Sequence, residues 1–432
     1  MKAFVKKLIP GFLMSFYHFT LAELAALFYF YPTRRMIVVG VTGTKGKSST
    51  AYLIAKILEG AGYKVGLTST VLFKIGGREW LNPYKMTMLG RFKLQGILNK
   101  MAREGVEYAV VETSSEGILQ HRHRGIGYDV AVFTNLSPEH LEAHGSYQNY
   151  RAAKAELFKN LKKKKINGRA IPRVIVANAD DEEGEFFLSF PADDKYAFSL
   201  ENKRASEAGA VLAKEIAIGE GGSHFKVDGE GFELKLIGRF NVYNALAAIS
   251  VGVSQSIELA KMSEALKAVC AIPGRFEFID VGQPFKIIVD YAHEPKSMEE
   301  LYAAINLVSH KRVLHVFGAT GGGRDKAKRP VLGAIAARGA DAVIVTNDDP
   351  YSEDQNAIAD QVIAGVRGVS SEIFCEKILD RREAIHRALD LAQNDDVVLI
   401  TGKGAEQKMA LGRKKIPWDD RRIIKEELKK IF

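Results

Sequence analysis

Cysteine is scarce in this sequence: the 432 residues contain only two, Cys270 and Cys375, and these lie far apart. Two cysteines exclude a disulfide scaffold and a four-cysteine zinc site, and they are typical of a reducing cytosol. The sequence also lacks internal repeats, long low-complexity segments and the alternation of aromatic and basic residues seen in nucleic-acid-binding modules. We therefore expect a cytoplasmic protein without a nucleic-acid partner.

Length and charge narrow the possibilities further. With 47% hydrophobic and 26% charged residues the composition is that of an ordinary globular protein. A chain of 432 residues is too long for one core, so two or three domains are expected. The net charge of +9 favours an acidic ligand, namely a nucleotide, an anionic substrate or an anionic lipid surface. The run Lys162 to Lys165 is predicted to be a solvated helix end or loop.

The N-terminal segment, residues 1–35, is apolar and rich in aromatic residues up to Pro32. Its length would span a bilayer, but His18 and Glu23 within it argue against a clean span. Two interpretations stay open: a helix that lies on the inner face of a membrane, or a helix that caps a protein core. The flanking basic residues, which favour the first, are Lys2, Lys6, Lys7, Arg34 and Arg35.

A glycine-rich turn follows this segment. A β-branched run from Ile37 leads into GTKGKS, residues 43–48, and a helical pattern comes next. Glycines let backbone amides surround an anion, and the start of a helix adds partial positive charge. Lys47 would reach the β- and γ-phosphates and Ser48 would bind Mg²⁺. The spacing departs from the standard phosphate loop, which would need a glycine at Val41. The pattern still predicts ATP binding.

The rest of the chain alternates short apolar runs with helical segments. Up to Ala271 the runs MIVVGV, YAVVET, YDVAVFTNL and RVIVANAD predict buried parallel strands, with a β-rich insertion at about residues 195–237. From Ile272 on, FKIIVDYAH, RVLHVFGA, DAVIVTND and DVVLITGKG predict a second, smaller doubly wound domain. The fold class is therefore α/β.

Several polar residues beyond the turn are candidates for chemistry. Glu112 ends a predicted strand, where it could bind Mg²⁺ or cap the next helix. His140 and His144 are four residues apart, but the order HLEAH and the lack of a third ligand make zinc a weak interpretation. One histidine could instead lie near Mg²⁺ or phosphate. Spacing alone would make Lys154 a surface lysine.

Taken together, the motifs resemble those of the Mur ligase family, in the branch that adds the third amino acid of the peptidoglycan stem peptide. Ten segments match in the family's order, between about residues 43 and 407: GTKGKSS, ETSSEG, FTNLSPEHLEAHG, YRAAKAELF, NADD, GRFNVYNALAA, IPGRFEFI, VDYAHEP, GGGRDKAKRP and ITGKGAEQ. The resemblance implies a central P-loop-type ATPase domain with a parallel sheet, residues 36–271, and a C-terminal Rossmann-like domain, residues 272–432.

The resemblance also implies a reaction. An acceptor carboxylate attacks the γ-phosphorus of ATP, and an amino acid's amine then converts the acyl phosphate to an amide, with a muramyl-peptide-like acceptor in peptidoglycan synthesis. Lys154 would correspond to the family's carbamylated lysine, whose carbamate oxygens bind Mg²⁺. The implied catalytic residues are Lys47, His140, Lys154 and Arg324. The implied metal ligands are Ser48, Glu112, His140 and carbamylated Lys154.

The same comparison assigns binding residues. Nucleotide binding would involve Gly43, Thr44, Lys45, Gly46, Lys47, Ser48, Ser49, Asn241, Asn244, Arg275, Asp290 and His293. The other substrates would meet Arg122, Asp348, Asp349, Tyr351, Lys403 and Glu406.

Some positions depart from the family pattern. The apolar segment stands in place of the family's N-terminal UDP-sugar domain, so we expect an acceptor that is membrane-linked or held differently. Tyr351 replaces an arginine of the diaminopimelate-adding enzymes, which removes a bidentate partner for the distal carboxylate. Glu116 and Ala405 stand where histidines are usual. The departure at Tyr351 disfavours diaminopimelate as the added amino acid.

Other functions remain open alternatives. One is another ligase of the superfamily, of the folylpolyglutamate or cyanophycin type or acting on a lipid-linked acceptor, although HLEAHGSYQNYRAAKAELF favours the muramyl side. A second is a P-loop ATPase or nucleotide switch without ligase chemistry. A third is a membrane-bound scaffold, against which the set Lys47, Glu112, His140 and Lys154 argues.

Overall fold

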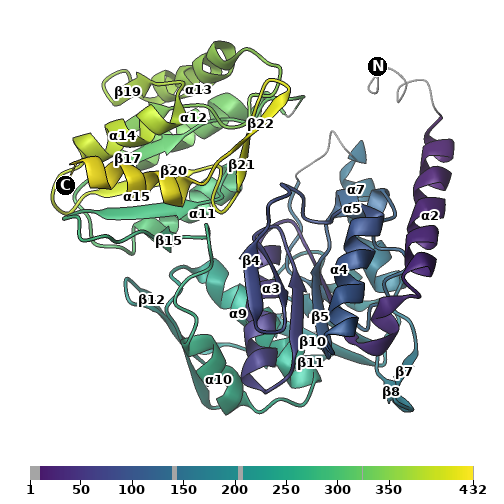
Figure 1. Cartoon of the computed structure of the whole chain (residues 1–432). Coiled ribbons are helices and arrows are strands. Elements are labelled where there is room, and N and C mark those ends of the chain that lie inside the picture. Colours follow the sequence, from purple (N-terminus) through teal and green to yellow (C-terminus); the bar gives the residue numbers. More distant parts are fainter. Residues whose placement is uncertain (1–9, 139–143, 203–207, 324, 432) are drawn as a thin grey trace.

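A nine-stranded sheet forms the framework of the larger part of the chain (Figure 1). The computed structural model describes residues 10–138, 144–202, 208–323 and 325–431. The sheet's strands are, in spatial order, β11 (Gly209–Leu212), β10 (Asp194–Ser199), β9 (Val174–Asn178), β6 (Val130–Phe133), β1 (Ile37–Thr42), β5 (Tyr108–Glu112), β2 (Val65–Thr68), β3 (Leu72–Ile75) and β4 (Arg78–Leu81). β3 is antiparallel to both of its neighbours, β2 and β4, and the remaining pairs are parallel. The four predicted strands β1, β5, β6 and β9 are confirmed.

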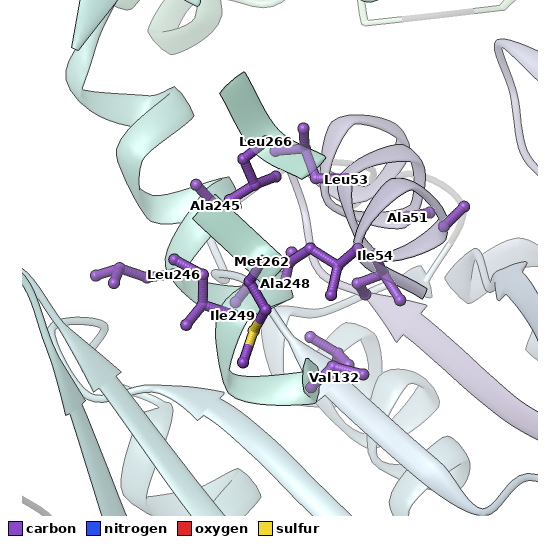
Figure 2. Packing of buried hydrophobic residues seen from close by; sticks show 14 of the residues in the cluster. Ala51, Leu53, Ile54, Val132, Ala245, Leu246, Ala248, Ile249, Met262 and Leu266 are labelled. Atoms are coloured by element: carbon purple, nitrogen blue, oxygen red, sulfur yellow. The ribbon is translucent and has the colours of Figure 1, made fainter. Parts of the chain in front are cut away.

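Alternate residues of the central strands pack against opposite layers of helices. Val39 and Val41 of β1 belong to one buried cluster, whereas Val38 belongs to the other. The first cluster is closed by α3 (Lys47–Gly60), α9 (Arg239–Ser254) and α10 (Leu259–Lys267), whose side chains interdigitate in Figure 2. The second is closed by α4 (Arg91–Arg103), α5 (Ser115–Leu119), α7 (Tyr147–Lys159) and α8 (Gly184–Leu188).

The predicted β-rich insertion divides between two sheets. β10 and β11 extend the main sheet. The adjacent residues Ala197 and Phe198 of β10 are buried on opposite faces of this sheet, one in each core cluster. The rest forms a separate antiparallel sheet of β12 (Lys214–Gly219), β13 (Gly222–Val227) and β14 (Glu230–Leu234), which leads into α9.

The C-terminal part is built on a second, six-stranded sheet. Its order is β15 (Glu277–Phe278), β16 (Lys286–Asp290), β20 (Val397–Thr401), β17 (Val313–Phe317), β18 (Ala342–Val345) and β19 (Phe374–Lys377), and only β15 is antiparallel. The helices are α11 (Pro295–Ile305), α12 (Lys328–Gly339), α13 (Gln355–Val369), α14 (Arg381–Leu391) and α15 (Asp420–Ile431), and β21 (Lys408–Leu411) pairs with β22 (Lys414–Pro417). This confirms the predicted doubly wound arrangement.

The N-terminal helix α2 (Gly11–Phe28) lies against α4 on the outside of the larger part (Figure 1). Its small residues Ala22, Ala25 and Ala26 are buried, while Phe12 and Phe16 are about 70% exposed. None of the helices in the described residues has the length and apolar character needed to cross a bilayer. The short helix η1 (Pro32–Arg35) connects α2 to β1.

The lysine run after α7 is exposed at Lys162, Lys163 and Lys165, as predicted for a solvated end, but Lys164 differs. Lys164 begins β7 (Lys164–Ile166), which pairs with β8 (Arg169–Ile171). Its ammonium is nearly buried, lies 2.5 Å from the Asp129 carboxylate and donates to the carbonyl of Met36 at 2.8 Å. The tertiary fold places the Asp129 carboxylate beside Lys164. The hydrogen bond from Lys164 to Met36 stabilises the chain just before β1.

Candidate active site

The turn between β1 and α3 has a conformation that requires glycine at two positions. Gly43 has φ of 152° and Gly46 has φ of 75°. A Cβ atom on Gly46 would lie 2.3 Å from Asn244 Oδ1, and one on Gly43 would lie 1.9 Å from Thr134 Oγ1. Helix α3 begins at Lys47, so the turn presents the N-terminus of a long helix to whatever it binds.

Residues from both parts of the chain line one cavity of about 580 Å³ at this turn. Its polar wall runs from the turn across the C-terminal ends of the strands to the segment that follows β16. Parallel α/β sheets bind ligands at this edge. The predicted site residues that line it are Thr44, Lys45, Gly46, Lys47, Ser48, Ser49, Glu112, Arg122, Lys154, Asn244, Arg275, Asp290, His293 and Glu406.

Glu112 connects the turn to its neighbours. Its buried carboxylate accepts hydrogen bonds from Ser48 Oγ at 2.9 Å and from the Thr70 backbone amide at 2.7 Å. The Thr70 hydroxyl donates to the second carboxylate oxygen at 3.0 Å and lies 2.8 Å from that of Thr87. Carboxylate and hydroxyl oxygens facing a phosphate loop are the ligands that Mg²⁺ prefers, so these residues fit a magnesium ion. The sequence alone did not indicate Thr70 or Thr87.

Histidine ligation of zinc finds no support in the part of the chain that is described. No group of three or more His, Cys, Asp or Glu side chains is placed there to bind a metal. His144 Nε2 lies 3.1 Å from Ser115 Oγ, and burial together with the nearby Lys154 ammonium lowers its pKa. His140 lies outside the described residues.

Lys154 is buried beside the turn, in contrast to what spacing alone suggested. Only 1% of it is exposed, and its Nζ donates to the carbonyl of Gly43 at 2.6 Å. The ammonium also lies 4.3 Å from the centroid of the Tyr150 ring. Helix α7 therefore directs a cation onto the first residue of the turn.

The residues assigned to the nucleoside come from α9, beside the turn, and from the C-terminal part of the chain. Asn244 accepts a hydrogen bond from Thr50 Oγ1 at 3.2 Å. Arg275 lies 4.4 Å from the centroid of the Tyr291 ring. The Asp290 carboxylate accepts from the backbone amide of Phe276 at 2.7 Å. Burial raises the pKa of Asp290, although the Arg275 charge opposes that shift.

A cluster of charges lies where the two parts of the chain meet. Lys403 Nζ is 3.1 Å from Asp348 Oδ1, 2.5 Å from Asp349 Oδ2 and 3.1 Å from Glu406 Oε2. Lys85, from the loop between β4 and α4, contacts Asp349 and lies 2.9 Å from Glu406. Burial would lower the pKa of Lys403, but Asp348 and Glu406 raise it above its usual range. Lys85 belongs to none of the matched motifs, so only the structure reveals it.

The remaining predicted residues differ in their relation to the cavity. Tyr351 does not line it, and its ring covers Gly322, where an added Cβ would lie 2.6 Å from the ring. Arg122 lines the cavity and donates to the carbonyl of Met88 and, at 2.7 Å, to Gln120 Oε1. Arg324 is not described. The residues that are not among those lining the described cavity are Gly43, Asn241, Asp348, Asp349, Tyr351 and Lys403.

Fold and cavity together define a two-part α/β protein in which a phosphate-binding turn faces a smaller Rossmann-like unit. Two family models match the chain: the Mur ligase middle domain over residues 41–252, and the Mur ligase glutamate ligase domain over residues 274–404. The chain belongs to the Mur ligase family. It is a ligase, as the sequence predicted, and its family's enzymes are ATP-dependent acid–amino-acid ligases.

Named relatives agree with this placement. The chain is 40% identical over 414 residues to a UDP-N-acetylmuramyl-tripeptide synthetase of Roseiflexus sp. (strain RS-1), which covers 93% of this chain and 80% of the relative. It is 39% identical over 413 residues to the UDP-N-acetylmuramoyl-L-alanyl-D-glutamate–2,6-diaminopimelate ligase of Geobacillus thermodenitrificans (strain NG80-2), covering 95% and 82%. A solved structure with the latter title superposes with a TM-score of 0.60 at 28% identity, covering 92% of this chain and 79% of that one.

Proposed function

We propose that this protein adds an amino acid to the carboxylate of a muramyl-peptide acceptor in peptidoglycan stem-peptide synthesis, with ATP and Mg²⁺. The observation that carries the proposal is the single cavity in which the phosphate turn, the Ser48–Glu112 pair, Lys154 and C-terminal residues meet. A ligase needs this combination, because nucleotide, acceptor and amino acid must react in one place.

We assign each group of cavity residues a role in binding the nucleotide or the metal ion. Amides of the turn and Lys47 bind the phosphates, while Asn244, Arg275 and Asp290 face the nucleoside. Ser48 and Glu112 would hold Mg²⁺, which would supply positive charge to the phosphates. Lys154, as ammonium or as carbamate, lies within reach of the same phosphates through its contact with Gly43.

The reaction proceeds in two balanced steps. An acceptor carboxylate oxygen attacks the γ-phosphorus, the bond to the β-phosphate oxygen breaks, and an acyl phosphate and ADP result. The amine of the amino acid then attacks the acyl carbon, phosphate leaves, and the amine loses its proton. Cationic groups at the cavity neutralise the charge that develops in both steps. Walls from both parts of the chain limit access of water, which would hydrolyse the acyl phosphate.

The identity of the substrates rests on fewer residues. We propose that diaminopimelate is not the preferred amino acid, because Tyr351 offers no guanidinium to a distal carboxylate. This would separate the chain from the Geobacillus relative, whose name specifies 2,6-diaminopimelate. A preference for diaminopimelate over lysine in the assay below would contradict this part.

Phosphate release by the purified protein tests the proposal. ATP, Mg²⁺ and bicarbonate are supplied with UDP-muramyl-dipeptide or a lipid-linked acceptor, each crossed with single amino acids. We expect release only when both an acceptor and one amino acid are present. Release that needs no acceptor would indicate a nucleotide switch or ATPase. In a parallel reaction with a folate in place of these acceptors, release would indicate a different ligase of the superfamily.

We further propose that α2 holds the protein at an anionic membrane surface. Residues 1–35 carry five basic residues and one acidic residue, a net charge of +4 of the chain's +9. Phe12, Phe16 and Phe28 are 65–72% exposed, and Phe28 lies 6.1 Å from the partly exposed ring of Phe92. Exposed aromatic residues beside positive charge favour an interfacial location.

Vesicle co-sedimentation tests this contact. The double variant Phe12→Ser/Phe16→Ser should bind phosphatidylglycerol vesicles less than the wild type, while phosphatidylcholine vesicles bind neither. Phe374→Ser, on the C-terminal sheet edge, serves as the exposed-aromatic control. Equal binding of the double variant, or of a chain without residues 1–32, would refute the membrane contact.

A further inference from the structure

A positively charged hairpin follows α7 on the outside of the larger part (Figure 1). Its segment, residues 162–173, holds six basic residues and no acidic one. Asn167 and Gly168 form the tight turn between β7 and β8, with left-handed φ values of 49° and 82°. Lys164 Nζ donates to the carbonyl of Thr33 at 3.2 Å, which holds the hairpin against η1 at the end of α2. The basic residues of the hairpin and of η1 are therefore neighbours.

Most of these cations lack an acidic partner among the described residues. Lys164 is paired with Asp129 at 2.5 Å, and Arg173 is paired with Asp193 at 2.7 Å. Within the residues that the structure describes, the basic patch consists of six exposed cations that form no ion pair with a carboxylate: Arg34, Arg35, Lys162, Lys163, Lys165 and Arg169. Like charges gathered in this way repel one another, so a negatively charged surface would stabilise them.

Phe30 lies at the end of α2, just before η1, in an unusual conformation for a phenylalanine. The amide of Tyr31 donates to the carbonyl of Ala26 at 2.8 Å, and that of Phe30 donates to Leu27 at 2.9 Å. This is a Schellman motif in which Phe30, with φ of 56°, takes the place usually filled by glycine. The strained residue is nevertheless 85% exposed, so packing within the fold does not explain it. Strain that presents a large aromatic ring to the outside indicates a binding role.

We propose that Phe30 and the basic patch together form a second contact with an anionic lipid bilayer, separate from that of Phe12 and Phe16. The phenyl ring enters the interface between headgroups and acyl chains, and the cations of η1 and the hairpin bind lipid phosphates. This inference rests on the proposed membrane contact of α2 and extends it to a different part of the fold.

Two contacts would fix the orientation of the protein on the membrane. A single helix on a surface can still roll about its axis, whereas a second contact beside the helix prevents that rotation. Both α2 and the hairpin belong to the larger part and lie on its side away from the C-terminal part (Figure 1). A bilayer on this side leaves the C-terminal part free to move against the cavity.

A matched pair of double variants tests the charges. Lys163→Gln/Lys165→Gln removes two cations from the β7–β8 hairpin, and Lys414→Gln/Lys415→Gln removes two exposed cations from the β21–β22 hairpin of the C-terminal part. Partitioning onto phosphatidylglycerol vesicles, measured by co-sedimentation, should fall about thirtyfold for the first variant and less than about threefold for the second. High salt should remove the difference.

Phe30→Asn tests the aromatic ring. Asparagine tolerates the left-handed conformation, so the variant keeps the end of the helix and loses only the ring. Vesicle partitioning should fall about tenfold, while the urea midpoint should stay equal or rise. Phe374→Asn, at an exposed aromatic residue of β19, is the control and should leave partitioning within about twofold. A lower urea midpoint with unchanged partitioning would make Phe30 a structural residue and overturn its role.

The two membrane contacts can fail separately. If Phe12→Ser/Phe16→Ser binds vesicles like the wild type but Lys163→Gln/Lys165→Gln does not, this contact stands and that of α2 fails. The reverse pattern, or equal losses in the two lysine variants, would overturn the inference. Hairpin-dependent binding to single-stranded RNA, without vesicle binding by the wild type, would also overturn it. Phosphate release in solution should stay unchanged in every variant, so the ligase proposal is tested independently.

Discussion

Lys154 Nζ donates a hydrogen bond to the carbonyl oxygen of Gly43 at 2.6 Å, which joins helix α7 to the first residue of the phosphate-binding turn. A buried ammonium at this position adds positive charge where a triphosphate would lie. The contact also explains why small residues surround it: Ala153 and Ala155 let α7 pack closely against the sheet, and both are buried.

Replacing Lys154 should therefore remove activity. We expect Lys154→Met to lower phosphate release about 100-fold or more, because the cation or carbamate beside the phosphates is lost. Lys159→Met changes an exposed lysine of the same helix and should retain activity within about twofold. If Lys154 is carbamylated, withholding bicarbonate should lower wild-type activity and leave the variant unchanged. A fully active Lys154→Met protein would remove Lys154 from the site.

Glu112→Gln tests the magnesium site. The amide keeps the size of the carboxylate but loses its charge, so half-maximal activity should require about tenfold more Mg²⁺ and kcat should fall. Mg²⁺ titrations of phosphate release measure both effects. Glu185→Gln, an exposed residue of α8, is the control. An unchanged Mg²⁺ requirement in Glu112→Gln would show that the carboxylate only positions Ser48 and Thr70.

Gly46→Ala should destabilise the protein through strain and a clash together. The residue has φ of 75°, and the new Cβ would lie 2.3 Å from Asn244 Oδ1. Gly62→Ala is the matched control, because its φ is 92° but no atom lies within 4 Å of an added Cβ. We expect a loss of about 1 kcal/mol for Gly62→Ala and about 2–3 kcal/mol for Gly46→Ala. Urea unfolding measures both, and equal losses would mean that Asn244 moves aside freely.

His123 predicts a dependence of stability on pH. Burial, reinforced by Arg124, lowers its pKa from 6.5 to about 3 in the folded protein. Between these values the unfolded chain binds the proton and the folded chain does not, so stability falls as the pH drops below about 6.5. The contribution is up to about 1.4 kcal/mol per pH unit.

Substitution of His123 checks that sign. His123→Leu should lose less stability than the wild type between about pH 7 and pH 5, by about 2 kcal/mol. His224→Leu, an exposed histidine of β13, should leave the wild-type profile unchanged. Parallel profiles for the wild type and His123→Leu would show that the imidazole is protonated within the fold.

The local sequence pattern was sufficient to predict the strands and the turn on which the site is built. The apolar runs from Ile37, Tyr108 and Val130 form strands because β-branched side chains suit positions buried on both faces of a parallel sheet. The glycines at 43 and 46 indicated an anion-binding turn, and the structure places that turn at the head of α3. The parallel arrangement of these strands follows from the same alternation of runs and helices, whereas their order in the sheet does not.

Tertiary structure alone decided which distant charges meet. Lys164 was predicted to be solvated, but the fold places Asp129 beside it. Lys85 lies outside every motif and approaches Asp349 only because two domains pack together. The sequence determined the elements, the turn and the family resemblance, since these depend on residues near one another in the chain. Ion pairs between domains depend on long-range packing, which no local pattern encodes.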